Sequence, residues 1–319
     1  MNATLNGIFG QFEYWRKANF PAKLADANSM HVIVGCGTSY NLALSVAAMM
    51  NANGFRALAV PSGEWIERAE SYVSNAEKDI VVIALSRSGT TTETVQAARI
   101  SRERGQKVIG ITCEPGSALS SESDLPIEFD THPEEGIVMT SSASLMLLAG
   151  YALSGMKIDG ALIDSAEKLV ALVGDGVSDA FLKRDHFVFL GGGSNYGVAL
   201  EGSLKLQEMA IAFTQAYHPG EYRHGPVSLV DEGTVVVMLY HPDTAKDESV
   251  LVKELQDKGA LVIGLGGPGD VSFDLYCNHG LCGAEVLPAL QVLGERYALA
   301  RRIDTTAPRH LSKVVVLDA

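Results

Sequence analysis

The sequence predicts an α/β protein in which two doubly wound parallel sheets follow one another along the chain, each flanked by helices. Three observations predict it. Short apolar runs alternate with longer helical patterns, a glycine-rich turn follows the first apolar run of each half, and the pattern of the first half returns in the second. Near-continuous apolar runs are typical of parallel strands that are buried on both faces.

In the first half, residues 1–29 are predicted to form a helical lead-in with several aromatic anchors. Five strands are then expected, because each segment is short, apolar and bounded by turn residues. They are residues 31–34, 56–60, 80–85, 107–112 and 125–129. Helices are expected between them and at the end of the half, over residues 42–53, 95–100 and 142–153.

The second half repeats this pattern at a nearly constant spacing. Segment 191–200 resembles segment 35–44, 156 positions earlier, while 235–239 and 259–265 follow their counterparts by 154 positions. A constant offset through several elements indicates an internal repeat. We therefore predict two domains, residues 1–155 and 156–319, joined near residues 154–164, where glycines and polar residues gather.

Composition limits the classes of partner. The 319 residues include 25 Lys and Arg against 38 Asp and Glu, a formal charge of −13, which is unfavourable for nucleic-acid binding. No apolar run is long enough to span a membrane, and the first residues lack a signal-peptide pattern. Four cysteines fit a reduced, cytoplasmic protein. The segment from Cys277 to Cys282 is a weak metal motif, and we expect neither a metal nor a cofactor.

The segment 85–94 is the strongest functional signal from the residues alone. It connects a buried apolar strand to a helix and contains Ser86, Ser88 and Thr91 around Gly89. Helix N-termini at the carboxyl edge of a parallel sheet bind anions, and hydroxyl groups add donors. The alternative is an ordinary Ser/Thr-rich helix cap. Residues 86–92 carry five hydroxyl groups in seven positions. Because this number exceeds what a cap requires, we predict a phosphate loop.

The second half departs from the first at this loop and carries ionisable groups elsewhere. Tyr240-His241-Pro242-Asp243 replaces the hydroxyl loop, and the proline and aspartate oppose anion binding. Glu201, Lys205 and Glu208 share one face of a predicted helix after the glycine turn. Such a stripe is either a solvated ion pair or part of a site, and we take Lys205 as a candidate substrate contact.

Several motifs together resemble the family of double sugar isomerase (SIS) domain proteins. They are Gly37-Thr38-Ser39-Tyr40, Ser86-Arg87-Ser88-Gly89-Thr90-Thr91, and the segments 199–208, 220–226 and 304–313. The last three are similar to the isomerase half of glucosamine-6-phosphate synthase. The resemblance extends from about His31 to the C-terminus, and it implies two flavodoxin-like SIS domains.

The resemblance implies a role for each matching residue. The sugar 6-phosphate would be held by Gly37, Thr38, Ser39, Ser86, Ser88 and Thr91, with further substrate contacts from Val138 and Thr140. Glu208 would move a proton between C1 and C2, with Glu201 as the alternative base. His224 would open the sugar ring from the neighbouring subunit, which implies a homodimer.

Lys313 matches a C-terminal lysine that forms an imine with the open-chain sugar in this family. The alternative is an ordinary strand-edge lysine, because the apolar residues 314–317 predict a strand directly after it.

The sequence also departs from the synthase. Asn2 follows the initiator methionine where the synthase has the catalytic cysteine of its glutaminase domain, so we expect no glutamine chemistry. Arg87 stands where the synthase has glutamine, and Ser141-Ser142-Ala143 replaces its Ser-Thr-Lys segment. Arg87 suits either a fork to phosphate or an acidic substrate tail, or a surface arginine that caps the loop. The segments Met139-Thr140-Ser141-Ser142 and Arg223-His224-Gly225-Pro226 look closer to aminosugar-6-phosphate deaminase/isomerases and fructosamine-6-phosphate deglycases.

Three functional hypotheses follow. The first is a sugar-6-phosphate isomerase or aminosugar-6-phosphate deaminase that works by proton transfer at C1 and C2. The second is a deglycase acting on an amino-acid conjugate of a sugar 6-phosphate. The third is a sugar-phosphate sensor without catalytic activity, which would retain binding but show no turnover.

Overall fold

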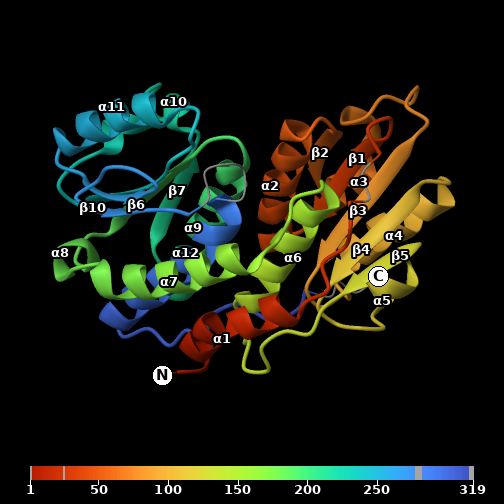
Figure 1. The fold of residues 1–319 in the computed structure, drawn as a ribbon, viewed down its shortest axis with the longest axis horizontal. Helices are drawn as coiled ribbons and strands as arrows, with labels where there is room; N and C mark the ends of the chain where they lie inside the picture. The colour runs from red at the N-terminus through yellow and green to blue at the C-terminus, as the bar shows by residue number, and fades with distance from the viewer. Residues whose placement is uncertain (1, 24–25, 277–281, 316–319) are drawn as a thin grey trace. The chain divides into compact units, whose positions relative to one another are not determined.

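The computed structural model describes residues 2–23, 26–276 and 282–315 (Figure 1). The chain folds into two compact units, each of which is discontinuous in sequence. We call Gly10–Ile158 with His310–Ala319 the first unit, and Met1–Phe9 with Asp159–Arg309 the second unit. These units differ from the sequential domains 1–155 and 156–319 at the chain ends. Lys313 is therefore part of the unit that contains the predicted phosphate loop, whereas Glu208 is part of the other unit.

The first unit contains a parallel sheet of five strands in the order β2-β1-β3-β4-β5. Its strands are β1 (Met30–Gly35), β2 (Arg56–Pro61), β3 (Ile80–Ser86), β4 (Lys107–Thr112) and β5 (Leu125–Glu128). In β1 and β3 nearly every side chain is buried, as the apolar runs predicted. The register pairs Val32 with Val82 and Val34 with Ala84.

Helices cover both faces of this sheet, and they are α2 (Thr38–Ala52), α3 (Ser62–Arg68), η1 (Ala69–Ser71), α4 (Thr92–Glu103), α5 (Ala118–Ser121) and α6 (Ser141–Leu153). Figure 1 shows α2 and α6 side by side. They approach closely because Gly150 has no side chain, and a Cβ there would lie 2.4 Å from Val46. A hydrogen bond of 2.6 Å between Ser45 Oγ and Tyr151 Oη also links the two helices.

The second unit has a parallel sheet with the matching order β7-β6-β8-β9-β10. Its strands are β6 (His186–Gly191), β7 (Phe213–Tyr217), β8 (Thr234–Leu239), β9 (Leu261–Leu265) and β10 (Val271–Phe273). In both sheets the first strand along the chain lies between the second and the third. The prediction of two doubly wound parallel sheets is therefore confirmed.

The helices of the second unit are α7 (Gly160–Gly176), α8 (Asp179–Leu182), α9 (Ser194–Ala210), α10 (Pro219–Tyr222), η2 (Pro226–Leu229), α11 (Ala245–Gln256) and α12 (Cys282–Ala300). In Figure 1, α10 and α11 lie on one face of the sheet, and α9 and α12 on the other. Helices α9 and α12 pack closely at Gly202 and Gly294, where added Cβ atoms would lie 2.7 Å from Leu290 and 2.9 Å from Met209.

Two predicted elements differ from the structure. The lead-in is helical only over α1 (Ala3–Lys17), because the chain from Ala18 to Asn28 contains a proline and several turn residues. The strand expected at 314–317 lies partly outside the described residues, and Val314 and Val315 are not in a strand. Residues 277–281 of the weak metal motif also lie outside the described part. No described helix is both long enough and apolar enough to cross a membrane.

Candidate active site

The two neighbouring strands β1 and β3 define the candidate site in the first unit. From β1 the chain crosses to β2 on one side, and β3 lies on the other side. At such a switch point the loops after the two strands diverge, and the space between them is where open α/β sheets bind ligands. The loops that follow β1 and β3 are the two segments that the sequence selected.

After β1 the chain turns sharply into α2. Gly37 has a positive φ of 55°, a conformation that favours glycine. Gly35 is equally constrained, since a Cβ there would lie 2.6 Å from the backbone of Ser39. Thr38 and Ser39 follow in the first turn of α2, and each is only 5% exposed. Their hydroxyl groups are thus fixed at the edge of the sheet.

After β3 the hydroxyl loop makes a second tight turn. Gly89 has a φ of 59°, and an added Cβ would lie 2.0 Å from Ser117 Oγ. The amide of Gly89 donates to the carbonyl of Ser86 over 3.2 Å. Ser86 Oγ donates to Thr91 Oγ1 over 3.3 Å, and Thr90 donates to Ser88 Oγ. These bonds gather the loop hydroxyls in front of α4.

The N-termini of α2 and α4 bear on whether the hydroxyl loop is a phosphate site or a helix cap. Thr91 is the N-cap residue of α4, yet its side chain makes no capping hydrogen bond. Gly37, the N-cap residue of α2, has no side chain that could cap the helix. By contrast, Ser117 and Asp159 cap α5 and α7 with their side chains. The Thr91 hydroxyl is therefore not used to cap α4. Two helix dipoles and several hydroxyl donors meet here, an arrangement suited to a phosphate.

The loop between β5 and α6 is organised by Glu135, which is 6% exposed. Its Oε1 accepts from the backbone amides of Thr140 at 2.5 Å and Ser142 at 3.0 Å, and from both hydroxyl groups. The carboxylate thus occupies the N-terminus of α6, where a negative charge is stabilised. The predicted contact residues Val138 and Thr140, 4% and 2% exposed, are held in place by this loop.

Arg87 connects this loop to the C-terminal segment. Its Nη1 donates to the carbonyls of Gly136 and Ile137, both at 3.0 Å, and its Nη2 donates to the carbonyl of Lys313 at 2.6 Å. Both terminal nitrogens of the guanidinium group are therefore engaged by backbone oxygens. Of the interpretations offered by the sequence, these contacts favour a structural arginine.

Lys313 lies beside the same loop. Its Nζ donates to the backbone carbonyl of Glu135 over 3.4 Å, a long contact with a neutral acceptor. Among the described residues no carboxylate lies within ion-pair distance of this ammonium group. The first unit thus brings the hydroxyl loop, the 135–140 loop and a C-terminal lysine together.

In the second unit, α9 carries the predicted Glu-Lys-Glu stripe. The side chain of Lys205 is completely buried, with Nζ 3.1 Å from Glu201 Oε1 and 2.6 Å from Glu208 Oε2. Burial lowers the pKa of Lys205, but the two carboxylates more than offset this, so its pKa is raised above the ordinary value. The stripe is therefore not a solvated ion pair.

The two glutamates differ in access. The side chain of Glu201 is fully buried, whereas that of Glu208 is 20% exposed. A base must reach its substrate, so this difference favours Glu208 over Glu201 as the group that exchanges protons. Lys205, being inaccessible, is suited to positioning the Glu208 carboxylate.

His224 lies on the surface of the second unit, between α10 and η2. Its backbone amide donates to the carbonyl of Glu221 over 3.0 Å, and Gly225 follows with a φ of 129°. The side chain is exposed, so it is available to a partner or a ligand.

The loop after β8 is organised around a carboxylate of the chain itself. The carboxylate of Glu248, 4% exposed, accepts from the His241 amide over 2.8 Å and from Thr244 Oγ1 over 2.8 Å. Burial raises the pKa of Glu248, while these hydrogen bonds and His241 act in the opposite direction. A carboxylate of the chain itself thus takes the donors that an external anion would need.

Sequence reasoning missed the roles of Glu135 and Glu248. Each follows another acidic residue in a polar segment, where most carboxylates are solvated. For Glu248 a signal existed, because it lies 154 positions after Thr94, the spacing that relates the two halves. For Glu135 no spacing or motif distinguishes it from Glu134.

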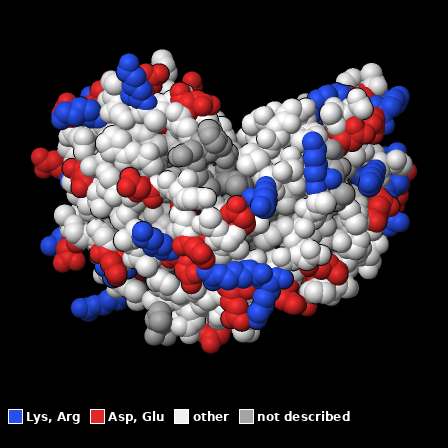
Figure 2. All heavy atoms as spheres, viewed as in Figure 1, with Lys and Arg blue, Asp and Glu red and all other residues white. Residues whose placement is uncertain are grey.

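Figure 2 shows acidic and basic side chains interspersed over the face drawn. Among the described residues no group of His, Cys, Asp and Glu is arranged to hold a metal ion.

The SIS domain family matches residues 23–155 and again residues 180–288 of this chain. Among curated proteins, the glutamine–fructose-6-phosphate aminotransferase (isomerizing) of Pyrobaculum aerophilum is 32% identical over 312 residues, 90% of this chain and 51% of the relative. The enzyme of the same name from Aquifex aeolicus is 30% identical over the whole chain and 56% of its own length. The chain spans about half the length of these relatives.

Among solved structures, glucosamine-6-phosphate deaminase from Thermotoga maritima is 32% identical, with a TM-score of 0.85 over 99% of this chain and 100% of that one. Tagatose-6-phosphate ketose/aldose isomerase from Escherichia coli has a TM-score of 0.74 at 22% identity, a likeness of fold alone.

Proposed function

The chain belongs to the SIS domain family, and from this premise we propose that it is a phosphosugar enzyme that deaminates an aminosugar 6-phosphate or interconverts an aldose and a ketose 6-phosphate. The observation that carries the proposal is the pair of helix N-termini after β1 and β3, neither capped by a side chain and both bordered by buried hydroxyl groups. Such a cradle suits the phosphate of a small molecule. The deaminase alternative is supported by a relative that matches the whole chain.

In this proposal the residues divide the work. Gly37, Thr38, Ser39, Ser86, Ser88 and Thr91 hold the phosphate and fix the sugar, and Val138 and Thr140 contact it further. His224 opens the ring, and the family resemblance assigns it to the neighbouring subunit of a homodimer. Lys313 is available to form an imine with the open-chain carbonyl.

Glu208 is the proposed base. It removes the proton from C2 of the open-chain aldehyde and returns a proton to C1. With a hydroxyl at C2 the product is a ketose. With an amine at C2 the product is an imine, which water hydrolyses to the ketose with release of ammonia. One base therefore serves both outcomes, and the C2 substituent decides which occurs.

The first experiment measures ammonia release from glucosamine 6-phosphate and galactosamine 6-phosphate, with the sugar product followed in parallel. Ammonia together with a ketose 6-phosphate supports the deaminase. Ketose formation from an aldose 6-phosphate without ammonia supports the isomerase. If neither reaction occurs but these ligands stabilise the fold, the deglycase and sensor hypotheses gain support, and release of an amino acid from a fructosamine 6-phosphate conjugate separates them.

Glu208→Gln tests the base directly. The variant keeps the size of the side chain, so we expect it to bind substrate but to lose at least about 100-fold in turnover, the usual contribution of general base catalysis. Glu67→Gln, an exposed glutamate on α3, is the matched control. Full activity of Glu208→Gln would exclude Glu208 from this role.

A further inference from the structure

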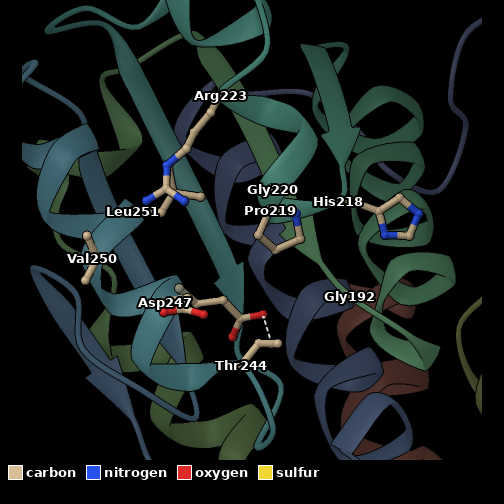
Figure 3. Close-up of a pocket in the computed structure, with 10 residues that line it drawn as sticks. Gly192, His218, Pro219, Gly220, Arg223, Thr244, Asp247, Val250 and Leu251 are labelled. Atoms are coloured by element: carbon tan, nitrogen blue, oxygen red, sulfur yellow. Dashed lines mark hydrogen bonds between the residues drawn. The ribbon is translucent and has the colours of Figure 1, made fainter.

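The second unit has a pocket of about 550 Å³ at the carboxyl edge of its sheet. Three segments line it (Figure 3). They are the turn at Gly192 after β6, the residues from His218 to Gly220 after β7, and the first half of helix α11 after β8. Its volume lies in the range of small-molecule sites. All of its lining residues belong to the second unit.

The equivalent position in the first unit is closed by side chains. There Thr94 Oγ1 lies 3.1 Å from Ser62 Oγ and 3.7 Å from Cys36 Sγ, and Ser62 and Thr94 are fully buried. In the second unit Gly192 takes the place of Cys36 after the first strand, and Pro219 takes that of Ser62. A Cβ on Gly192 would meet only Glu248 Oε1, at 3.9 Å. The missing side chain leaves room that the first unit lacks.

The polar groups of this pocket favour a cation. Asp247 and Glu248 supply two carboxylates, and among the described residues no cation forms an ion pair with either of them. Arg223 also lines the pocket, but its guanidinium group is held by Glu254 through bonds of 3.0 and 3.1 Å. An anion would be repelled by these carboxylates, whereas an ammonium group would find an acceptor in Asp247.

The remaining lining suits a ring-shaped polar molecule. The imidazole of His218 stacks on Tyr196 with a centroid separation of 3.9 Å, so its plane is fixed while its ring nitrogens can exchange hydrogen bonds. Figure 3 shows the Asp247 carboxylate and the Thr244 side chain on the α11 side and the Pro219 ring on the α10 side. Apolar surface beside a few polar groups is typical of sites for small molecules.

We propose that this pocket binds a small organic ammonium compound of monosaccharide size, such as an unphosphorylated amino sugar, independently of the phosphate loop. Asp247 accepts the ammonium group, and the stacked His218 bonds a hydroxyl group. Phosphorylated forms are disfavoured here because both carboxylates oppose the phosphate and Pro219 has no amide hydrogen to donate.

Isothermal titration calorimetry on the full chain tests the proposal, with glucosamine as the ammonium probe and N-acetylglucosamine as its neutral counterpart. Asp247→Asn removes the acceptor charge, and Gly192→Met fills the pocket. Asp243→Asn is the matched control, because it removes the same charge from the adjoining loop outside the pocket lining.

We expect glucosamine to bind at least tenfold more tightly than N-acetylglucosamine. Asp247→Asn and Gly192→Met should each weaken glucosamine binding at least tenfold, and Asp243→Asn should leave it within about twofold, since surface charges away from a site contribute little. Thermal unfolding without ligand checks that the variants are folded.

Two results would overturn the proposal. One is the absence of glucosamine binding at concentrations up to about 10 mM, beyond the range of a specific site. The other is binding that both pocket variants leave unchanged, which would place the ligand elsewhere on the chain. Neither result depends on the catalytic assays, so the proposed function and this proposal fail separately.

Discussion

Replacement of Arg87 should release the C-terminal segment from the first unit. The guanidinium group bonds three backbone carbonyls, two in the loop at Gly136 and Ile137 and one at Lys313. A hydrogen bond from a charged donor contributes about 1.5–3 kcal/mol when buried. Because two of these bonds are exposed and the third is partly buried, we expect Arg87→Ala to cost about 1–2 kcal/mol in local stability.

A local loss of this size raises the open population of the segment about 5- to 30-fold. Hydrogen exchange of the backbone amides of residues 310–315 measures it, because exchange from a locally opened state follows the open population. Arg99→Ala is the control, since Arg99 on α4 also lies in the first unit but pairs with Glu122, the residue after α5. Arg99→Ala should leave exchange at 310–315 unchanged.

Arg87→Lys separates a clamp from a phosphate ligand. Lysine keeps the charge but has no planar fork, so it cannot span three carbonyls. If Arg87 is a clamp, Arg87→Lys should show the same rapid exchange as Arg87→Ala and a lower kcat, because Lys313 is no longer held. Unchanged exchange together with a KM that rises in Arg87→Ala and recovers in Arg87→Lys would refute this reasoning and favour a phosphate contact.

Three further predictions follow from the site geometry. Gly89→Ala should destabilise the hydroxyl loop by about 1–3 kcal/mol and abolish phosphate-dependent thermal stabilisation, whereas Gly116→Ala, which also has a positive φ but nothing within 4 Å, should retain that stabilisation. Lys205→Met should cost about 3–5 kcal/mol in urea unfolding because two carboxylates lose their shared cation, and the outcome that contradicts this is a stability equal to wild type. Burial raises the pKa of Glu248, so its ionised form opposes folding above that raised pKa, and the opposition disappears below its ordinary pKa of 4.5. Relative to wild type, Glu248→Gln should therefore be more stable at pH 7 than at pH 4.5. Urea unfolding at both pH values measures the difference in the free energy of unfolding between the two proteins. The same difference at both pH values would count against this prediction.

The sequence by itself determined the fold class and the place of the hydroxyl loop between a strand and a helix. Strand order depends on the whole fold. It could still be predicted here, because the apolar runs are short and the same turns recur at a constant spacing, so one doubly wound arrangement fits both halves. The hydroxyl loop was equally visible, because a strand, a glycine turn and a helix in direct succession form a local structure. Segment 85–94 needs no distant contact to be recognised.

Only the tertiary structure decided how isolated charges are used. Arg87 and Lys313 are 226 positions apart, and no local pattern joins them, yet one hydrogen bond does. The tail that carries Lys313 packs with the first unit, although it follows the second half in sequence. Glu135 and Glu248 read as ordinary surface carboxylates, and their burial at helix starts follows from the packing of loops around them. Sequence periodicity reports which face of an element is apolar, but the partner of a buried charge is set by elements that meet only after folding.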